Sequence, residues 1–287
     1  MSAVFKHELR GYFNSLTAYI FCAFMLLFVG VGAMLYNIQS AVANFEYVLE
    51  FVCIGLVVII PVLTMKTFAE EKKQKTDQLL YSLPISGTDI VLGKFFALLV
   101  IYLVPVAIIS FYPHIFAKYG DVYLPTSYGS LAAFVFLGAA LISIGMFISS
   151  LTENQGFAAG IAIPVLLFNY YSVTLAEYVS STSAGAFFTF IIIIALVAWL
   201  IWHLTRNYYV AYAIAFGGLA GTGIVFYKNP DSFEGILPDI MSKLSLFERF
   251  YDFVDGVFDI TALVFYVTVI IFFLFMCVQS LEKRRYN

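Results

Sequence analysis

Long apolar runs recur along the whole chain, and they constrain the fold more than any other feature of the sequence. A helix needs about 20 mostly apolar residues to cross a bilayer. Eight runs near this length cover residues 17–38, 48–66, 89–112, 129–151, 156–176, 185–204, 208–227 and 260–281. The runs are continuous rather than alternating, which favours helices over a membrane barrel. The sequence therefore predicts an all-α, polytopic helical membrane protein with about eight transmembrane helices.

The composition excludes a soluble globular enzyme. Of the 287 residues, 62% are apolar and only 11% are charged, and the mean hydropathy is +0.93, whereas soluble domains contain about 25% charged residues. The net charge of −3 is too small, and the basic residues too scattered, to indicate nucleic-acid binding. Cys22, Cys53 and Cys277 lie inside apolar runs, so no disulfide framework is expected.

The lysines and arginines are divided unevenly between the two sides of the membrane. If the N-terminus is cytoplasmic, the cytoplasmic side carries Lys6, Arg10, Lys66, Lys72, Lys73, Lys75, Lys94, Arg206, Lys283, Arg284 and Arg285. The other side then carries only Lys118, Lys228, Lys243 and Arg249. Because cytoplasmic loops carry the excess of positive charge, we expect a multi-pass protein of the cytoplasmic membrane with both termini in the cytoplasm.

We expect one transmembrane domain over residues 1–287, with three more polar segments. Residues 1–16 form an expected interfacial helix, because apolar side chains recur at helical spacing at Phe5, Leu9, Tyr12, Phe13 and Leu16. Residues 67–88 form a cytoplasmic loop with the densest charge in the chain. Residues 228–259 combine seven acidic residues with phenylalanines at helical spacing, which predicts short amphipathic helices on the outer leaflet.

The loop between the second and third runs carries a short helical pattern. Thr76 can cap a helix, and Pro84 prevents the helix from continuing. Leu79, Leu80 and Leu83 fall on one side of it. Such an apolar knob suits a groove on a soluble partner. The alternative is a solvated loop whose leucines pack back on the helix bundle.

The third run begins with its own start signal. Ser86 and Asp89 have the spacing of a capping box. The stretch GTDIVLGKF at 87–95 differs from a phosphate-binding loop, because five residues separate its glycines and a Phe follows the Lys. We therefore expect no nucleotide-binding motif, and no enzymatic activity, in this chain.

Several stretches together resemble one known family. They are FAEE at 68–71, Thr76, Leu79-Leu80, Leu83-Pro84 and VLGK at 91–94, with HELRGYFNSLTAYIF near the start and LSLFERFYDFVDGVFDI and SLEKRR near the end. In this order and spacing they are similar to permease subunits of ABC transporters. The resemblance is to the type-2 exporter-like permeases related to gliding-motility and multi-copper-maturation permeases.

The resemblance implies a transport function powered by other subunits. The 67–88 loop would contain a coupling helix that docks on a separate ATPase through Thr76, Asp77, Leu79, Leu80, Leu83 and Pro84. Glu70 and Glu71 would lie at a cytoplasmic gate, paired with basic residues of the interfacial helix or of the ATPase. Two cytoplasmic ABC ATPases would bind ATP and magnesium, and this chain would hold no cofactor. A second permease subunit, of the same or a related chain, would complete an exporter in the lipid bilayer.

A typical member of that family has six spans, so the hairpin at 185–227 is additional. The competing hypothesis is a membrane scaffold or sensor that recruits ATPases without transporting a substrate.

Few polar groups occur inside the apolar runs. Asn169, Tyr170 and Tyr171 are candidates for a substrate path, or they tie helices together. Glu46 and Glu50 fall at the outer end of the second run, where we expect them to reach water. The lack of further carboxylates argues against a proton-coupled transporter.

The remaining motifs give weaker signals. The histidines at 7, 114 and 203 are too scattered to predict a metal site. The pair Glu70-Glu71 occurs in intramembrane peptidases, but the arginine and the membrane-embedded histidines expected there are missing. Prolines within the second, third and fifth runs, at 61, 105 and 164, predict kinks. Glycines four residues apart, at 156 and 160 and at 217 and 221, permit close helix contacts.

Overall fold

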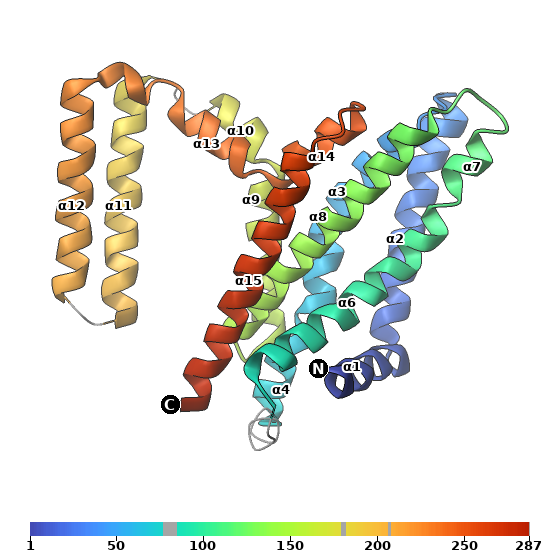
Figure 1. Ribbon diagram of the computed structural model, residues 1–287, viewed down its shortest axis with the longest axis horizontal. Coiled ribbons are helices and arrows are strands. Elements are labelled where there is room, and N and C mark those ends of the chain that lie inside the picture. The colour runs from blue at the N-terminus through green and yellow to red at the C-terminus, as the bar shows by residue number, and fades with distance from the viewer. Residues whose placement is uncertain (77–84, 179–181, 206–207, 287) are drawn as a thin grey trace. The chain divides into compact units, whose positions relative to one another are not determined.

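The chain folds into helices joined by short loops (Figure 1). The computed structural model describes residues 1–76, 85–178, 182–205 and 208–286, and no β-strand occurs among them. In chain order the elements are α1 (Ser2–Asn14), α2 (Leu16–Ala33), the π-helix η1 (Met34–Gln39), α3 (Glu46–Thr64), α4 (Lys66–Gln74), α6 (Gly87–Ile109), α7 (Tyr112–Phe116), α8 (Leu124–Leu151), α9 (Gln155–Tyr170), α10 (Ser172–Tyr178), α11 (Ser183–Thr205), α12 (Tyr208–Lys228), the 3-10 helix η2 (Pro230–Phe233), α13 (Ile236–Leu244), α14 (Leu246–Val254) and α15 (Ile260–Tyr286). The all-α prediction is confirmed.

A helix occupies each of the eight predicted runs. Within the described part, five helical stretches are long and apolar enough to cross a membrane: Leu16–Gln39, Glu46–Gln74, Gly87–Phe116, Leu124–Leu151 and Ile260–Arg284. A sixth is reached when α9 and α10 are counted as one broken span. In α11 the described apolar stretch, Ser183–Ala195, is shorter than a span. A polytopic helical membrane protein is confirmed, while the number eight stays a prediction.

The chain divides into two compact units. The first unit contains Met1–Tyr170 and Leu246–Asn287, and the second contains Tyr171–Ser245. In the second unit α11 and α12 pack against each other as a hairpin, and α10 packs against α13. The ring of Phe187 stacks on that of Phe226 with centroids 4.4 Å apart, and Phe233 meets both rings edge-on. This aromatic cluster holds one end of the hairpin together.

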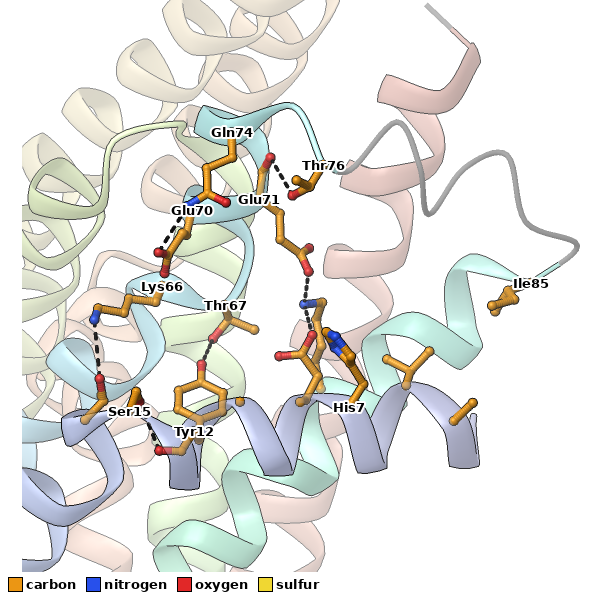
Figure 2. Close-up of a pocket in the computed structure, with 16 residues that line it drawn as sticks. His7, Tyr12, Ser15, Lys66, Thr67, Glu70, Glu71, Gln74, Thr76 and Ile85 are labelled. Carbon is orange, nitrogen blue, oxygen red and sulfur yellow. Dashed lines mark hydrogen bonds and ion pairs between the residues drawn. The ribbon is translucent and has the colours of Figure 1, made fainter.

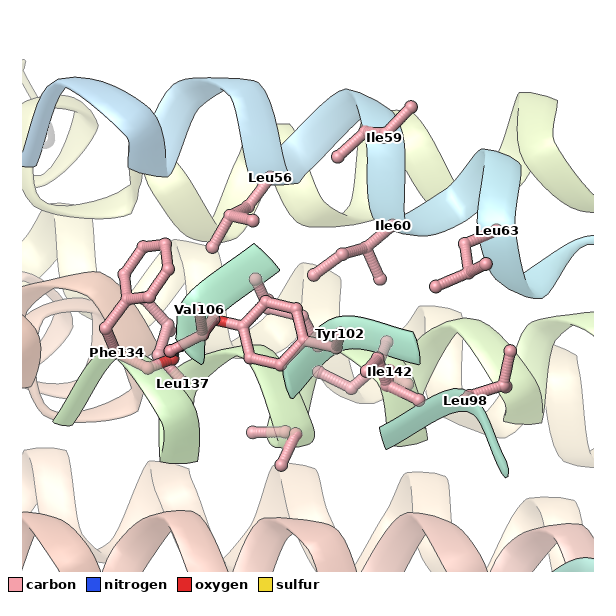
Figure 3. Packing of buried hydrophobic residues seen from close by; sticks show 14 of the residues in the cluster. Leu56, Ile59, Ile60, Leu63, Leu98, Tyr102, Val106, Phe134, Leu137 and Ile142 are labelled. Carbon is pink, nitrogen blue, oxygen red and sulfur yellow. Dashed lines mark hydrogen bonds between the residues drawn. The ribbon is translucent and has the colours of Figure 1, made fainter. Parts of the chain in front are cut away.

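Helix α8 lies at the centre of the first unit. It packs against α3, α6, α14 and α15, and most of its side chains along the span are buried. Figure 3 shows Leu56 and Ile60 of α3 and Tyr102 of α6 beside Phe134 and Leu137 of α8. The Tyr102 hydroxyl donates a 2.8 Å hydrogen bond to the backbone oxygen of Phe134, which satisfies a polar group that water cannot reach.

Two glycines of α8 let its neighbours approach closely. A Cβ atom on Gly138 would lie 2.2 Å from the Tyr102 ring, and one on Gly145 would lie 2.3 Å from the Thr64 hydroxyl oxygen. Both sites therefore require a residue without a side chain. In membrane bundles, where water does not drive helices together, such close packing supplies much of the association energy.

The glycines chosen from their spacing do not make such contacts. A Cβ atom would meet nothing within 4 Å at Gly160, Gly217 or Gly221. The close contacts that the spacing permits are therefore not made at these three glycines within the described part of the chain. The helices run through Pro61, Pro105 and Pro164, and each of them ends within one to two turns after its proline, at Thr64, Ile109 and Tyr170. The break after α9 is the sharpest, because α9 and α10 are bent by 61°.

Glu46 is buried, contrary to the expectation that it reaches water. Its side chain is 3% exposed. One carboxylate oxygen accepts a 2.7 Å hydrogen bond from the Asn44 amide and the other a 2.9 Å bond from the Ser127 hydroxyl. The bond from Ser127 attaches the start of α3 to the start of α8. The sequence could not show this contact, because Ser127 is 81 positions away.

The phenylalanine stripe of α14 faces the protein. Phe247, Phe250 and Phe253 are buried, and α14 packs against α8. Asn169 accepts a 3.1 Å bond from the Leu246 backbone N–H, and the Ser130 hydroxyl donates a 2.8 Å bond to the backbone oxygen of Phe253. The expected short helices are present, but this one uses its apolar face to cover α8 instead of resting on a lipid leaflet.

We expect Gly138→Ala to destabilise the first unit. The added methyl group would overlap the buried Tyr102 ring, and overpacking of this kind costs about 1–3 kcal/mol. Thermal unfolding of the detergent-purified protein measures the effect. Gly160→Ala is the matched control, because its Cβ would meet nothing within 4 Å; equal melting temperatures for both variants would contradict the assigned packing.

Candidate functional site

A pocket of about 830 Å³ lies between α1, α4 and the start of α6 (Figure 2). We call this region the α1 end of the first unit. At one extreme the pocket is lined by Ser15 and Thr17, where α1 passes into α2. At the other it is lined by Thr76 and Ile85, which flank the loop with the predicted coupling helix. The pocket therefore adjoins both the first span and that loop.

Helix α1 is amphipathic, as its sequence predicts. Val4 and Tyr12 are buried, whereas Lys6 and Arg10 are exposed. The Tyr12 hydroxyl lies 3.3 Å from the Thr67 hydroxyl, and burial raises the pKa of Tyr12 well above its usual range. Tyr12 thus stays neutral and fixes α1 against α4.

A buried cluster of three charges joins α1, α4 and α6. The Lys94 ammonium lies 2.7 Å from a carboxylate oxygen of Glu8 and 2.7 Å from one of Glu71. The Lys94 side chain is 1% exposed, while those of Glu8 and Glu71 are 15% and 24% exposed. A buried ammonium needs such partners, because removing a charge from water costs several kcal/mol.

The structure assigns different partners to the two predicted gate carboxylates. Glu71 pairs with Lys94 of α6, and the interfacial helix contributes the acid Glu8 rather than a base. Glu70 accepts only a 3.4 Å hydrogen bond from the Gln74 amide and makes no ion pair with a described residue. A role of either residue at a gate stays a prediction.

Ser149 of α8 fills a break between α3 and α4. Its hydroxyl oxygen accepts hydrogen bonds from the backbone N–H groups of Phe68 and Ala69, each 3.2 Å long, and donates a 3.0 Å bond to the backbone oxygen of Met65. A side chain inserted into the helical ladder in this way bends or loosens a helix. α4 is thus held by α8 and is separated from α3 by a break in the helical hydrogen bonds at Met65.

The C-terminal end of α8 holds α4 and α15 together. The Lys72 ammonium and the Ser280 hydroxyl both donate hydrogen bonds to the backbone oxygen of Ser150. Arg284 of α15 forms a 2.8 Å ion pair with Glu153, just after α8. Positive groups near a helix C-terminus are favourable, because unsatisfied carbonyl groups give that end a negative potential.

The ends of the predicted docking segment are well defined. Lys75 adopts a left-handed conformation with φ 58°, and the Thr76 backbone N–H donates a 3.0 Å hydrogen bond to the backbone oxygen of Glu71. Together these features end α4. At the C-terminal end of the segment, the Asp89 backbone N–H donates a 3.1 Å hydrogen bond to the Ser86 hydroxyl oxygen, which confirms the predicted cap of α6. The predicted docking residues Asp77, Leu79, Leu80, Leu83 and Pro84 lie outside the described residues.

The three candidates for a substrate path have separate environments. Asn169 accepts the bond from Leu246 described above, and the Tyr170 ring meets the Phe247 ring edge-on with centroids 5.0 Å apart. Tyr171 is exposed at the start of the second unit. Asn169 therefore connects helices, which agrees with one of the two alternatives, and a substrate path stays a prediction.

Sequence reasoning missed the two most informative side chains of the site. Lys94 was counted among the cytoplasmic basic residues and in a family-like stretch, but no partner was predicted for it, although a lysine inside an apolar span is itself a signal of a buried partner. Ser149 carries no local signal, because serine is common in membrane helices. Among the described residues, no group of three or more His, Cys, Asp and Glu side chains could hold a metal ion.

We expect Lys94→Met to destabilise the protein strongly, by about 3–5 kcal/mol, because it leaves two neighbouring carboxylates without their cation. Unfolding in detergent measures this loss, and adding Glu8→Gln and Glu71→Gln should recover part of it. Lys243→Met is the control, since its ion pair with Asp239 is exposed and such pairs contribute little. A loss no larger than in this control would contradict a structural role for the cluster.

Comparison with known proteins gives one family match. A family model described as ABC-2 family transporter protein matches residues 2–189. No curated protein matches the chain significantly, and the narrower likeness to gliding-motility and multi-copper-maturation permeases is not confirmed. The match spans more than half of the chain and includes α1, α4, α6 and α8, so this chain belongs to the ABC-2 family of transporter proteins.

Proposed function

We propose that the chain is the membrane subunit of an ABC exporter that moves a substrate across the cytoplasmic membrane. Membership of the ABC-2 family supports a permease subunit that works with an ABC ATPase. The family match carries the proposal. The proposal goes beyond the match in four respects. They are the direction of transport, the pairing of two permease subunits, the two ATPases that bind ATP and magnesium, and the location in the cytoplasmic membrane.

The proposed orientation places the α1 end in the cytoplasm. Both chain termini lie at this end of the first unit (Figure 1), and Gly87 near the start of α6 approaches Glu282 of α15. The bias of lysine and arginine toward this side supports the orientation through the positive-inside rule. The same side is accessible to a soluble ATPase.

Docking is proposed to use the 76–85 loop. Its two ends are fixed by the left-handed Lys75 and by the Ser86 cap. Leu79, Leu80 and Leu83 would supply the apolar contact. Because α4 ends directly before this segment and α6 begins directly after it, a force on the segment would reach both helices.

The contacts of α4 suggest how a displacement would spread. Glu71 connects α4 to α1 and α6 through Lys94, and Lys72 connects it to the end of α8. The break at Met65, filled by Ser149, lets α4 turn without forcing α3 to follow. ATPase closure would thus move α1, α4 and α6 together, in the manner of a hinge.

Docking is tested by Leu79→Asp combined with Leu80→Asp. We expect loss of ATPase co-purification, because two carboxylates would be buried in an apolar interface, while the membrane protein remains monodisperse. Tyr119→Asp with Tyr123→Asp is the matched control, since both tyrosines are exposed in the loop between α7 and α8. Undiminished co-purification of the leucine variant would refute the assigned docking segment.

Transport is tested separately with the reconstituted complex. If the complex is an exporter, a cargo should stimulate its ATP hydrolysis, and vanadate should inhibit that hydrolysis. The cargo should also accumulate in the lumen of inside-out vesicles. A response that stays flat across lipids, peptides and drugs would instead support the alternative, a scaffold or sensor that recruits ATPases.

A further inference from the structure

The pocket at the α1 end contains two opposite charges that do not neutralise each other. Lys66 and Glu70 are one helical turn apart on α4, a spacing at which such side chains commonly pair. The Lys66 ammonium instead lies 3.3 Å from the Thr17 hydroxyl, and Glu70 faces the Gln74 amide at 3.4 Å. Neither makes an ion pair with a described residue, and both line the pocket (Figure 2).

The pocket lies where a lipid head group would be found. Ser15 and Thr17 line it at the point where the amphipathic α1 ends and the first span begins. Amphipathic helices of this kind rest at the level of lipid head groups. Its volume of about 830 Å³ falls in the range of small-molecule sites, about 300–1,000 Å³.

We propose that this pocket binds the head group of a phospholipid with a primary amine, such as phosphatidylethanolamine. The phosphate would lie on Lys66 and the Thr17 hydroxyl, and the ammonium would lie on Glu70. Lys66 and Glu70 are four residues apart on α4, about 6 Å along the axis, and the short linker of ethanolamine suits such a separation. This inference goes beyond the proposed transport function and does not require it.

The lining chemistry discriminates between head groups. A primary ammonium donates hydrogen bonds to a carboxylate, which a quaternary choline cannot do. Choline is usually recognised by a cage of aromatic rings, and the described pocket lining contains only the rings of Tyr12 and His7. An anionic glycerol head group would leave Glu70 without a cation, and the net negative charge of the Glu8–Lys94–Glu71 cluster would not attract it.

Lipid binding by the purified full-length chain tests the proposal. The delipidated protein in detergent is titrated with phosphatidylethanolamine, phosphatidylcholine and phosphatidylglycerol of identical acyl chains, and bound lipid is counted by native mass spectrometry. We expect a preference of about tenfold for phosphatidylethanolamine, the effect of one charge-assisted hydrogen bond. Equal binding of the three lipids, or a preference for phosphatidylglycerol, would overturn the proposal.

Substitutions separate the two halves of the site. Glu70→Gln should remove the preference for the amine while leaving phosphatidylcholine binding unchanged. Lys66→Gln should weaken binding of both lipids, and Lys66→Arg should retain it. Lys73→Ala is the matched control on the same helix, because Lys73 is exposed and does not line the pocket.

A protein occupant is the competing outcome. If Glu70→Gln and Lys66→Gln release the ATPase but leave lipid binding unchanged, the pocket belongs to the protein partner and the lipid assignment is wrong. Lipid binding is measured without the ATPase. A negative result in the lipid-binding experiment can therefore be distinguished from a negative result in the docking test with Leu79→Asp and Leu80→Asp.

Discussion

The buried ammonium of Lys94 is the contact on which the α1 end depends. A lysine that is almost fully removed from water is stable only with carboxylates at hydrogen-bonding distance, and here they come from two different helices, α1 and α4. No pair of these elements can separate without exposing or isolating a charge. Helices α1, α4 and the start of α6 are therefore held together by this one cluster.

Helix α8 plays the complementary role inside the bundle. Its glycines bring Tyr102 and Thr64 close to its backbone, and its serines bond to main-chain atoms of neighbouring elements. Both devices act where water is absent and every polar group needs a partner. Their effect differs along the helix, since the glycines bring α3 and α6 close to α8, whereas Ser149 bonds to the backbone on both sides of the break at Met65. Close packing and the attachment of α4 thus come from one helix.

The sequence was informative where the physical signal is local. Apolar run length predicted the helices, and short-range spacing predicted the amphipathic α1 and the Ser86 cap of α6. It failed where the signal is a contact between distant positions. The burial of Glu46 depends on Ser127, and the glycines that matter are those facing a large side chain, which spacing alone does not reveal. The partners of Glu71 were likewise invisible, because Glu8 and Glu71 meet only through Lys94.

The bond between Asn169 and the Leu246 backbone determines how the second unit is connected to the first. It joins the last turn of α9 to the start of α14, so the chain leaves the first unit at Tyr170 and returns to it at the adjacent Leu246. A segment inserted between two neighbouring points places no demand on the remainder of the bundle, and lengthening such a loop adds little entropic cost. The whole segment Tyr171–Ser245, with its hairpin of α11 and α12, is therefore joined to the bundle like a long loop whose two ends meet.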